Sequence, residues 1–571
     1  MSRLWKIALA AVVGVLACGE PPLALRWAGG VSVGILVAPG ESGVLDAGRI
    51  IVRGPSDTTV NVTPGSTVTI GSLSPGTYVV SLEGLTGNQV EMFGQTPSVQ
   101  VVRGQNTAVT VTLASFRPTL SPLSGVTLGR QFVVSYPSVA GAQSYTVEWD
   151  KSASFPNPTK TSVTGTSAQI TVADEGLYYI RVRAMDSFES IGRASDSVST
   201  VIGALSSVGV GQIHSCASLT SGAAYCWGYN VEGELGNGVP GSSHTVPVAV
   251  QQGALRLQVL SVGDYHTCSV TTASVAYCWG LNSFGRLGDS TTTNRSAPTA
   301  VQGGLLFNNV SAGGSHTCGV AGGGTAYCWG WNASGQLGTG DMISRPVPTA
   351  VGGGFVFSTV SAGSQHTCGL TTGGAAYCWG RNAEGQLGAP AAQTCALLGA
   401  SFPCSTTPVL VSGGLTFVTV SAGVTHTCGV TASGAAYCWG ENTVGELGDG
   451  APVPSRAQPV AVHGGFTFAW VSAGKQGYTC GVTIAGQALC WGLGGRGELG
   501  DSTTITQTAP VAVWGGLTFL TASARGISAG AAATCAVAVT GAGYCWGANP
   551  SGELGDGTMN DRWVPTRVSN P

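Results

Sequence analysis

Cysteine is the residue whose spacing most plainly suggests chemistry in this chain of 571 residues. Of its 17 cysteines, fourteen form seven pairs with one constant spacing. The pairs are Cys216 with Cys226, Cys268 with Cys278, Cys318 with Cys328, Cys368 with Cys378, Cys428 with Cys438, Cys480 with Cys490 and Cys535 with Cys545. Cys368 and Cys378 are equidistant from Gly373, so a symmetric hairpin places their sulfurs opposite each other. We therefore expect a disulfide within each hairpin, and a further one between Cys395 and Cys404.

Histidine offers an alternative reading of the same pairs. In five of the seven pairs, the first cysteine has a histidine two positions earlier, and each His-x-Cys could supply two zinc ligands. Structural zinc sites prefer cysteines two to four residues apart, however, and the repeated histidines would lie far from one another. We expect a buried hydrogen-bonding histidine, no metal and no cofactor. Evenly paired cysteines favour disulfides in an oxidising compartment.

Other motifs of catalysis are missing from the sequence. It has no Gly-x-Ser-x-Gly elbow at a strand-helix junction and no Walker loop or dinucleotide fingerprint in βα context, so we expect no catalytic residues. Glutamates recur at one turn position, which would spread them around a ring rather than pair them. They are Glu234, Glu446, Glu498 and Glu553. Aspartates in Leu-Gly-Asp turns could bind Ca²⁺, but solvated turn residues are the expectation. They are Asp289, Asp449, Asp501 and Asp556.

The elements that position these residues are strands. Charged residues make up only 9% of the chain and glycine numbers 89, a composition that disfavours helices and predicts an all-β protein. The net charge of -3 argues against a nucleic-acid partner. Over residues 204–571 the first cysteine of each pair recurs in steps of 50 to 60 residues, and each copy offers about four short β-runs. Seven such copies predict a seven-bladed β-propeller.

One copy shows the repeat most clearly. It reads Val360-Ser361-Ala362-Gly363, His366-Thr367-Cys368, Tyr377-Cys378-Trp379-Gly380 and Gly385-Gln386-Leu387-Gly388. This pattern resembles the regulator of chromosome condensation repeat, a family that folds as a seven-bladed propeller. The copies depart from it at Tyr478 and Ala533, which replace the histidine, and at Gly494, which replaces an asparagine. This resemblance implies guanine-nucleotide exchange as one possible activity. Export and disulfides argue against it, and a secreted β-lactamase inhibitor with this fold shows that it also binds proteins.

The N-terminus resembles an export signal. Arg3 and Lys6 precede an apolar run from Ile7 to Ala17, which is too short to span a bilayer. We assign residues 1–17 to a signal peptide and residues 18–29 to a linker. Val15-Leu16-Ala17-Cys18 resembles the lipobox of bacterial lipoproteins, so we expect lipidation of Cys18, with plain cleavage after Ala17 as the alternative. Gly19 would allow sorting to the outer membrane in a host with two membranes, so we expect the protein at the outer membrane, cell surface or periplasm.

Two smaller β-sandwiches are expected ahead of the propeller. Residues 30–115 contain Leu73-Ser74-Pro75-Gly76-Thr77-Tyr78, which resembles the turn-strand signature of transthyretin-like, carboxypeptidase-regulatory domains. Residues 116–203 resemble a fibronectin type III domain. There Tyr145, Val147 and Trp149 alternate on one face of a strand. Tyr178 stands where that family has a corner tyrosine that bonds to the backbone.

Binding residues are expected where the repeats differ. The position after Trp-Gly is one that varies between copies, and we expect it on an exposed loop. Its residues are Tyr229, Leu281, Trp331, Arg381, Glu441, Leu493 and Ala548. With Phe284 nearby, we expect Tyr229, Phe284, Trp331 and Arg381 to bind, together with the disulfide-closed insertion Ala389–Thr407. The alternative is that these are ordinary loop residues.

The expected function is recognition of a protein or glycan at the cell envelope by an exported, non-enzymatic protein. Its only membrane contact would be the N-terminal lipid. The alternatives are nucleotide exchange and an envelope glycan lyase or hydrolase. The sequence does not predict an oligomeric state.

Overall fold

The structure of the chain is a computed structural model. It describes residues 29–34, 47–63, 67–86, 89–95, 98–102, 106–109, 111, 114–123, 126–187, 191–397, 399–451, 453–521 and 526–571. The predicted signal peptide and Cys18 lie outside these ranges. The regular elements of the described residues are strands plus one 3-10 turn, η1 (Ser283–Gly285), which confirms the all-β prediction. In this part of the chain, no helix has the length and hydropathy that a membrane crossing requires.

The chain divides into two compact units, and the larger one contains residues 202–571. The smaller unit begins with two sheets, ordered β4-β1-β8 and β3-β2-β5-β6-β9, with β7 paired to β5. Their strands are β1 (Gly29–Gly34), β2 (Ala47–Arg53), β3 (Thr58–Val62), β4 (Thr67–Leu73), β5 (Gly76–Thr86), β6 (Gln89–Gln95), β7 (Val99–Val101), β8 (Asn106–Val109) and β9 (Ala114–Ser115). Tyr78 is fully buried at the start of β5, and its hydroxyl donates to Ser74 O at 2.8 Å.

The next strands form sheets ordered β10-β16-β15-β12-β13 and β11-β14. They are β10 (Val126–Leu128), β11 (Gln131–Ser135), β12 (Ser144–Asp150), β13 (Thr159–Val163), β14 (Ser167–Thr171), β15 (Gly176–Met185) and β16 (Val198–Gly203). Tyr145, Val147 and Trp149 are all buried, as their alternation predicts. Tyrosine bonds to the backbone are made here by Tyr136 and Tyr145, while Tyr178 lies beneath the Lys151 ammonium. The transthyretin-like and fibronectin-like assignments stay predictions.

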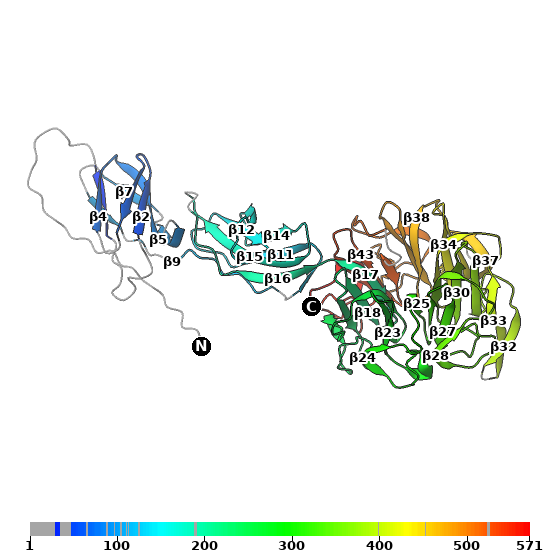
Figure 1. The fold of residues 1–571 in the computed structure, drawn as a ribbon. Helices are drawn as coiled ribbons and strands as arrows, with labels where there is room; N and C mark the ends of the chain where they lie inside the picture. The colour runs from blue at the N-terminus through cyan, green and yellow to red at the C-terminus, as the bar shows by residue number, and fades with distance from the viewer. Residues whose placement is uncertain are drawn as a thin grey trace, which may run out of the picture. The chain divides into compact units, whose positions relative to one another are not determined.

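Residues 205–567 fold into seven consecutive antiparallel sheets, which are the blades of a β-propeller (Figure 1). Blades one to three comprise β17 (Leu205–Val210), β18 (His214–Leu219), β19 (Ala224–Gly228), β20 (His244–Ala249); β21 (Leu257–Val262), β22 (His266–Thr271), β23 (Ala276–Gly280), β24 (Arg295–Ala300); β25 (Phe307–Ala312), β26 (His316–Ala321), β27 (Ala326–Gly330) and β28 (Arg345–Ala350). Each blade takes its strands from one continuous stretch of sequence, so the repeat and the blade coincide.

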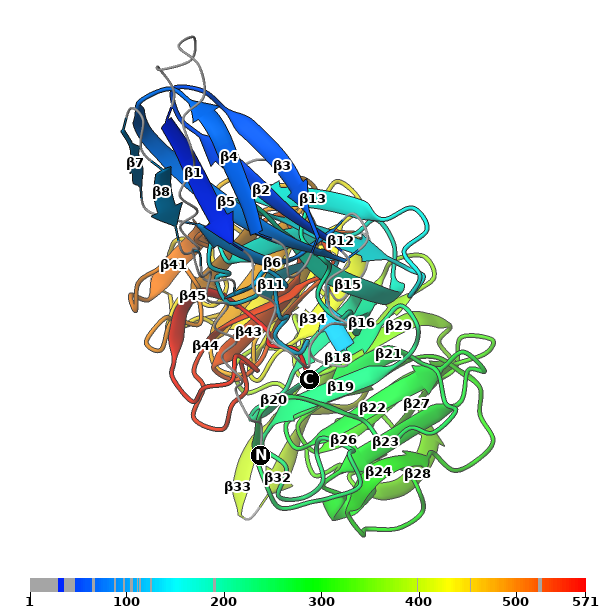
Figure 2. The same ribbon diagram turned by 90° about the vertical axis from the view of Figure 1, so that its left-hand side faces the viewer.

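Blade four has a fifth strand, and the remaining blades have four. Blades four to seven comprise β29 (Phe357–Ala362), β30 (His366–Thr371), β31 (Ala376–Arg381), β32 (Gln393–Leu397), β33 (Ala400–Leu410); β34 (Phe417–Ala422), β35 (His426–Thr431), β36 (Ala436–Glu441), β37 (Ser455–Ala461); β38 (Phe468–Ala473), β39 (Tyr478–Thr483), β40 (Ala488–Gly492), β41 (Gln507–Ala512); β42 (Ile527–Ala529), β43 (Ala533–Val537), β44 (Gly543–Gly547) and β45 (Arg562–Arg567). The extra hairpin β32–β33 extends the outer edge of blade four (Figure 2).

The repeated tryptophan of each third strand joins its blade to the one before. All seven are fully buried, because the motif brings each indole under the Leu-Gly turn of the preceding blade. Six of them donate their indole N–H to one backbone carbonyl of that turn, as Trp379 does to Gln336 O at 2.9 Å. The same carbonyl also accepts the hydroxyl of Thr367 at 2.8 Å. The positions shared by all copies therefore serve packing between blades.

A repeated proline lies on the strand that pairs with the third strand of each blade. In six blades this strand is the sheet edge, where the missing N–H leaves no donor for an added strand. These prolines are Pro247, Pro298, Pro348, Pro408, Pro459, Pro510 and Pro565. The repeated proline thus disfavours pairing of six sheet edges with other chains, whereas the edge of blade four is β32, which has no proline.

The ring closes without exchange of a strand between its ends. Blade seven and blade one lie side by side, where Val210 N donates to Ser528 Oγ at 3.0 Å (Figure 1). Trp227 N–H donates to Glu553 O at 2.7 Å across the same seam. Closure therefore uses the same contacts as the other blade interfaces.

Candidate functional site

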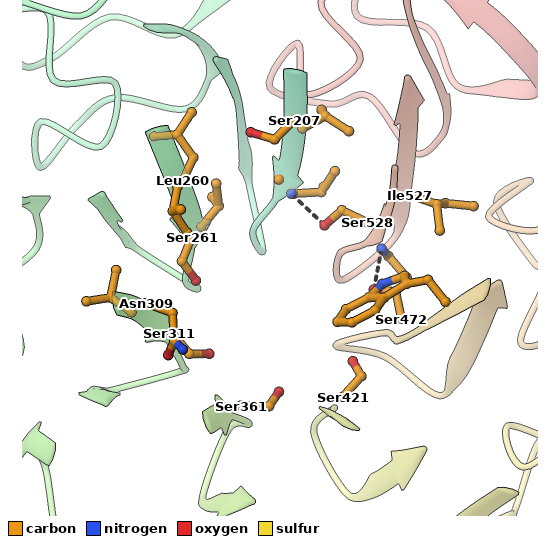
Figure 3. A pocket seen from close by; sticks show the side chains of 18 of the residues that line it. Ser207, Leu260, Ser261, Asn309, Ser311, Ser361, Ser421, Ser472, Ile527 and Ser528 are labelled. Atoms are coloured by element: carbon orange, nitrogen blue, oxygen red, sulfur yellow. Dashed lines mark hydrogen bonds between the residues drawn. The ribbon is translucent and has the colours of Figure 1, made fainter. Parts of the chain in front are cut away.

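The inner strands of the seven blades surround a central channel with a volume of about 500 Å³ (Figure 3). Six serines, one from each of blades two to seven, form a ring in it. They are Ser261, Ser311, Ser361, Ser421, Ser472 and Ser528. Each accepts a backbone N–H of the next blade at 2.9–3.0 Å, as Ser311 does from Ala362. The serines therefore link the blades, while their hydroxyl hydrogens have no acceptor in the described part of the chain.

One end of the channel is crossed by a lysine. Lys475, from the turn between the first two strands of blade six, reaches blade two, where its ammonium lies 3.2 Å from Asp264 Oδ1. It also donates to Val262 O at 3.0 Å. Burial lowers the pKa of Lys475, and the Asp264 carboxylate opposes that shift. Trp470 lies on the channel wall of the same blade. Sequence analysis missed both residues, although each departs from the repeat and could have been found on that ground.

The five repeated histidines are structural, as predicted. Each is fully buried, and its Nε2 lies 2.8–2.9 Å from a threonine hydroxyl of the next blade. His366, for example, pairs with Thr427, whose own hydroxyl donates to Gln386 O. Burial lowers the pKa of His366 to about 3, so the ring stays neutral. Because the neighbouring cysteines are joined to each other, His-x-Cys does not form the zinc site considered above.

The structure joins all eight expected cysteine pairs as disulfides. The seven blade disulfides join Cys216 to Cys226, Cys268 to Cys278, Cys318 to Cys328, Cys368 to Cys378, Cys428 to Cys438, Cys480 to Cys490 and Cys535 to Cys545. Their Cα atoms lie 4.0–4.1 Å apart on adjacent strands of one hairpin, as the symmetric hairpin predicts. Cys395 and Cys404 close the extra hairpin of blade four. In the described residues, no group of three or more His, Cys, Asp or Glu side chains could hold a metal ion.

The turn carboxylates are engaged in the fold. Glu234, for example, is fully buried, accepts the backbone N–H of Glu232, and has a pKa raised to about 7 by burial. The expectation of solvated aspartates is wrong for Asp289, because its buried carboxylate accepts from Asn282 and lies 2.8 Å from the Arg295 guanidinium. Similar arginine pairs involve Asp449 and Asp556. In these three turns an arginine supplies the positive charge that a cation would have provided.

The varied loop residues lie on one face of the propeller. The residue after each Trp-Gly donates its N–H to the turn between the first two strands of its blade, at 2.7–3.0 Å. In every blade except the sixth, a buried asparagine follows, and its side chain holds the loop; Asn332 Oδ1, for instance, accepts from Leu337 N. We call this surface the loop face. Tyr229, Trp331 and Arg381 are half-buried on it, whereas Ala548 is buried, contrary to the expectation of exposure.

Phe284 and Trp331 come together on the loop face. Their ring centroids are 6.1 Å apart, and Phe284 is 50% exposed. Phe284 has φ +64°, a left-handed conformation that an L-residue with a side chain rarely adopts. Blade two has Arg286 where other blades have Glu or Gln, so it lacks the side chain that accepts the N–H two residues earlier. Arg286 turns instead to Gly314 O at 2.9 Å, and Phe284 is presented outward.

Arg381 of the loop face packs against the extra hairpin of blade four. Its guanidinium carbon lies 4.8 Å from the centre of the Phe402 ring, and it also pairs with Glu384 at 3.4 Å. Phe402 is buried against the Cys395–Cys404 disulfide. Arg381 and the insertion are thus neighbours, as expected, but the arginine braces the hairpin. In the described residues no ring contact joins Tyr229 to Phe284.

Comparison with known proteins supports the repeat. The Regulator of chromosome condensation (RCC1) repeat matches residues 221–270, 275–320, 323–370 and 373–430, and a second form of it matches residues 260–286, 307–336, 357–386 and 417–446. The chain therefore carries RCC1 repeats. It is 32% identical over 155 residues to the probable E3 ubiquitin-protein ligase HERC3 of Homo sapiens. It is 31% identical over 173 residues to the ultraviolet-B receptor UVR8 of Arabidopsis thaliana.

These likenesses cover parts of the proteins. The match with HERC3 spans 27% of this chain and 14% of that protein, and the match with UVR8 spans 29% and 37%. Among solved structures, human WBSCR16 covers 61% of this chain and 94% of its own, with TM-score 0.53 and 20% identity. Yeast RCC1 (Prp20), solved with Kap60, covers 64% and 84%, with TM-score 0.53 and 19% identity. At this identity the likeness shows the fold, which is a β-propeller.

Proposed function

We propose that this chain is an exported, non-enzymatic recognition protein whose loop face binds a protein partner. The observation that carries the proposal is the Phe284–Trp331 pair. Two large aromatic rings meet on the loop face, and one of them is half exposed. Rings of this kind dominate the energy of protein interfaces. Phe284 also holds a strained backbone conformation, and such strain collects at functional positions.

Export is supported by the eight disulfides, since such bonds persist in oxidising compartments. Attachment to the outer membrane through a lipid on Cys18 is part of the proposal. Cys18→Ala should move the protein from the detergent phase to the aqueous phase on phase partitioning. Unchanged partitioning would mean plain secretion or another anchor.

Binding is tested by affinity capture from envelope extract, with the full chain and two variants. The wild type and Leu493→Ala, a matched change at the same loop position of blade six, should retain one set of partners. Trp331→Ala should lose that set while its thermal unfolding stays cooperative. Equal capture by all three proteins would refute a partner site at the aromatic pair.

A second candidate function is glycan binding in the central channel. The observation that favours it is Trp470, an aromatic side chain on the wall of a channel that is also lined by serine hydroxyls and by Asn309. A volume of about 500 Å³ lies within the range of small-molecule pockets. Quenching of tryptophan fluorescence by oligosaccharides, lost in Trp470→Ala, would favour this candidate over the aromatic pair.

A further inference from the structure

We propose that the loop face has a second binding element: a hollow between blades six, seven and one that receives a tyrosine side chain of a protein partner. The inference rests on the proposed function, because it names the chemistry of a partner for the same face. The hollow has a volume of about 190 Å³. Its lining includes Ile213, Gln476, Arg496, Ala548 and Glu553.

The hollow exists because blade seven lacks two side chains that other blades have. Ala533 stands where blades one to five have the interlocking histidine and blade six has Tyr478. Ala548 stands where other blades have a larger residue after Trp-Gly, such as Trp331. Both alanines line the hollow, together with Ala531 and Ala532. The position of the hollow thus follows from the two departures from the repeat.

The floor of the hollow is apolar, and it carries one acceptor. Glu553 is 4% exposed, and its Oε2 accepts Ser551 N at 2.8 Å. Its Oε1 keeps the capacity to accept a further hydrogen bond, since each carboxylate oxygen has two lone pairs. The lip carries the amides of Gln212 and Gln476 and the guanidinium of Arg496, which is held by Asp561 at 3.0 Å. Glu553 is the carboxylate of this lining, and it lies among alanines, whereas the amide oxygens of Gln212 and Gln476 belong to the lip. A buried carboxylate within small apolar walls calls for an apolar body tipped by one donor.

Tyrosine fits this chemistry better than the other side chains that could enter. Its ring can replace the missing side chains against the alanines, and its hydroxyl can donate to Glu553 Oε1. The Arg496 guanidinium at the lip attracts an aromatic ring face. It also disfavours a lysine, because a second cation would meet the charge of Arg496. A sugar would leave most of its hydroxyls facing alanine, which costs free energy.

The test is ligand-observed NMR titration of the full chain with N-acetyl-L-tyrosinamide. We expect saturable binding that is several-fold tighter than that of N-acetyl-L-phenylalaninamide, because only the phenol can donate to the carboxylate. Ala548→Leu introduces the residue that blades two and six carry there, and should weaken binding about tenfold or more by filling the hollow. Leu493→Ala is the control and should leave the titration unchanged.

Glu553→Gln tests the acceptor with little risk to the fold, since Gln336 and Gln386 occupy this turn position in blades three and four. Those glutamines accept the turn N–H through Oε1, so the variant should present its amide NH₂ to the hollow. The preference for tyrosinamide over phenylalaninamide should then shrink, because the phenol could only accept a neutral N–H bond in place of its charge-assisted bond to the carboxylate. The matched control is Glu446→Gln in blade five, which should keep the preference.

Several results would overturn the assignment. They are no saturable binding of tyrosinamide, binding unaffected by Ala548→Leu, or a preference that Glu553→Gln leaves as large as in the wild type. Tighter binding of N-acetylglucosamine or n-butylamine, lost in Ala548→Leu, would reassign the hollow to a glycan or a lysine. Because the titration does not involve Trp331, these failures are separate from failure of the aromatic pair to capture a partner.

Discussion

Phe284→Gly and Phe284→Ala together test whether the strained loop of blade two is real and what it is for. At φ +64° an L-residue costs about 1–2 kcal/mol, and glycine removes that cost. Glycine also makes the unfolded chain more flexible, which offsets about 0.4–1 kcal/mol. Either change removes the ring contact with Trp331, worth about 0.5–1.5 kcal/mol.

The sum predicts that Phe284→Gly leaves the free energy of unfolding within about 1 kcal/mol of the wild type. Phe284→Ala keeps the strain and loses the ring, so it should be less stable than the glycine variant by about 1 kcal/mol. Binding of the partner should fall in both. The glycine variant therefore separates stability from recognition.

The assay is urea unfolding followed by circular dichroism, with Ser551 as control. Ser551 has the equivalent position in blade seven and is not among the described residues with positive φ. There, alanine should be at least as stable as glycine. If Phe284→Ala proved as stable as Phe284→Gly, the left-handed conformation and the argument built on Arg286 would be wrong.

Two further predictions concern the blades. Stability should fall as the pH is lowered from about 6.5 toward 3, because His316, with a folded pKa of about 3, stays neutral while the unfolded chain takes up a proton. His316→Gln should flatten this fall in urea titrations at several pH values; an unchanged slope would contradict the buried neutral histidine. Replacing Cys368 and Cys378 by serine should cost about 2.7 kcal/mol for the 11-residue loop they close, measured by thermal unfolding. The same change at Cys395 and Cys404 should mainly increase proteolysis of the hairpin, and an equal global loss would contradict its peripheral place.

The repeat made most of the propeller predictable. Because the cysteine spacing is identical in seven copies, it predicted the hairpin in which Cys368 lies opposite Cys378. The period of the repeat predicted the number of blades. The buried histidine could also be predicted, because a residue repeated in most blades serves what those blades share. The pairing and burial that recur in every repeat are visible in its sequence, so sequence analysis could predict the structure within each blade.

What the sequence could not show is the direction in which the side chains of the connecting loops turn. The arginine partner of Asp289 comes from the next strand, so the aspartate is buried rather than solvated. Arg381 turns toward Phe402 of the insertion, a contact that spacing does not encode. The outward position of Phe284 follows from Arg286, which cannot accept the backbone N–H that Gln336 accepts in blade three and which donates to Gly314 O instead. The departures from the repeat marked these places, although not the direction in which each side chain would turn.

The measurement that tests the central claim most directly is the affinity of the captured partner for the wild type, Trp331→Ala and Leu493→Ala by isothermal titration calorimetry. Trp331→Ala should weaken binding by about 2 kcal/mol, close to thirtyfold, as expected for an aromatic hot spot. Leu493→Ala, on the opposite part of the loop face, should change the affinity by less than about twofold. Both variants should unfold cooperatively near the wild-type temperature. Equal affinities for all three folded proteins would contradict recognition through the aromatic pair.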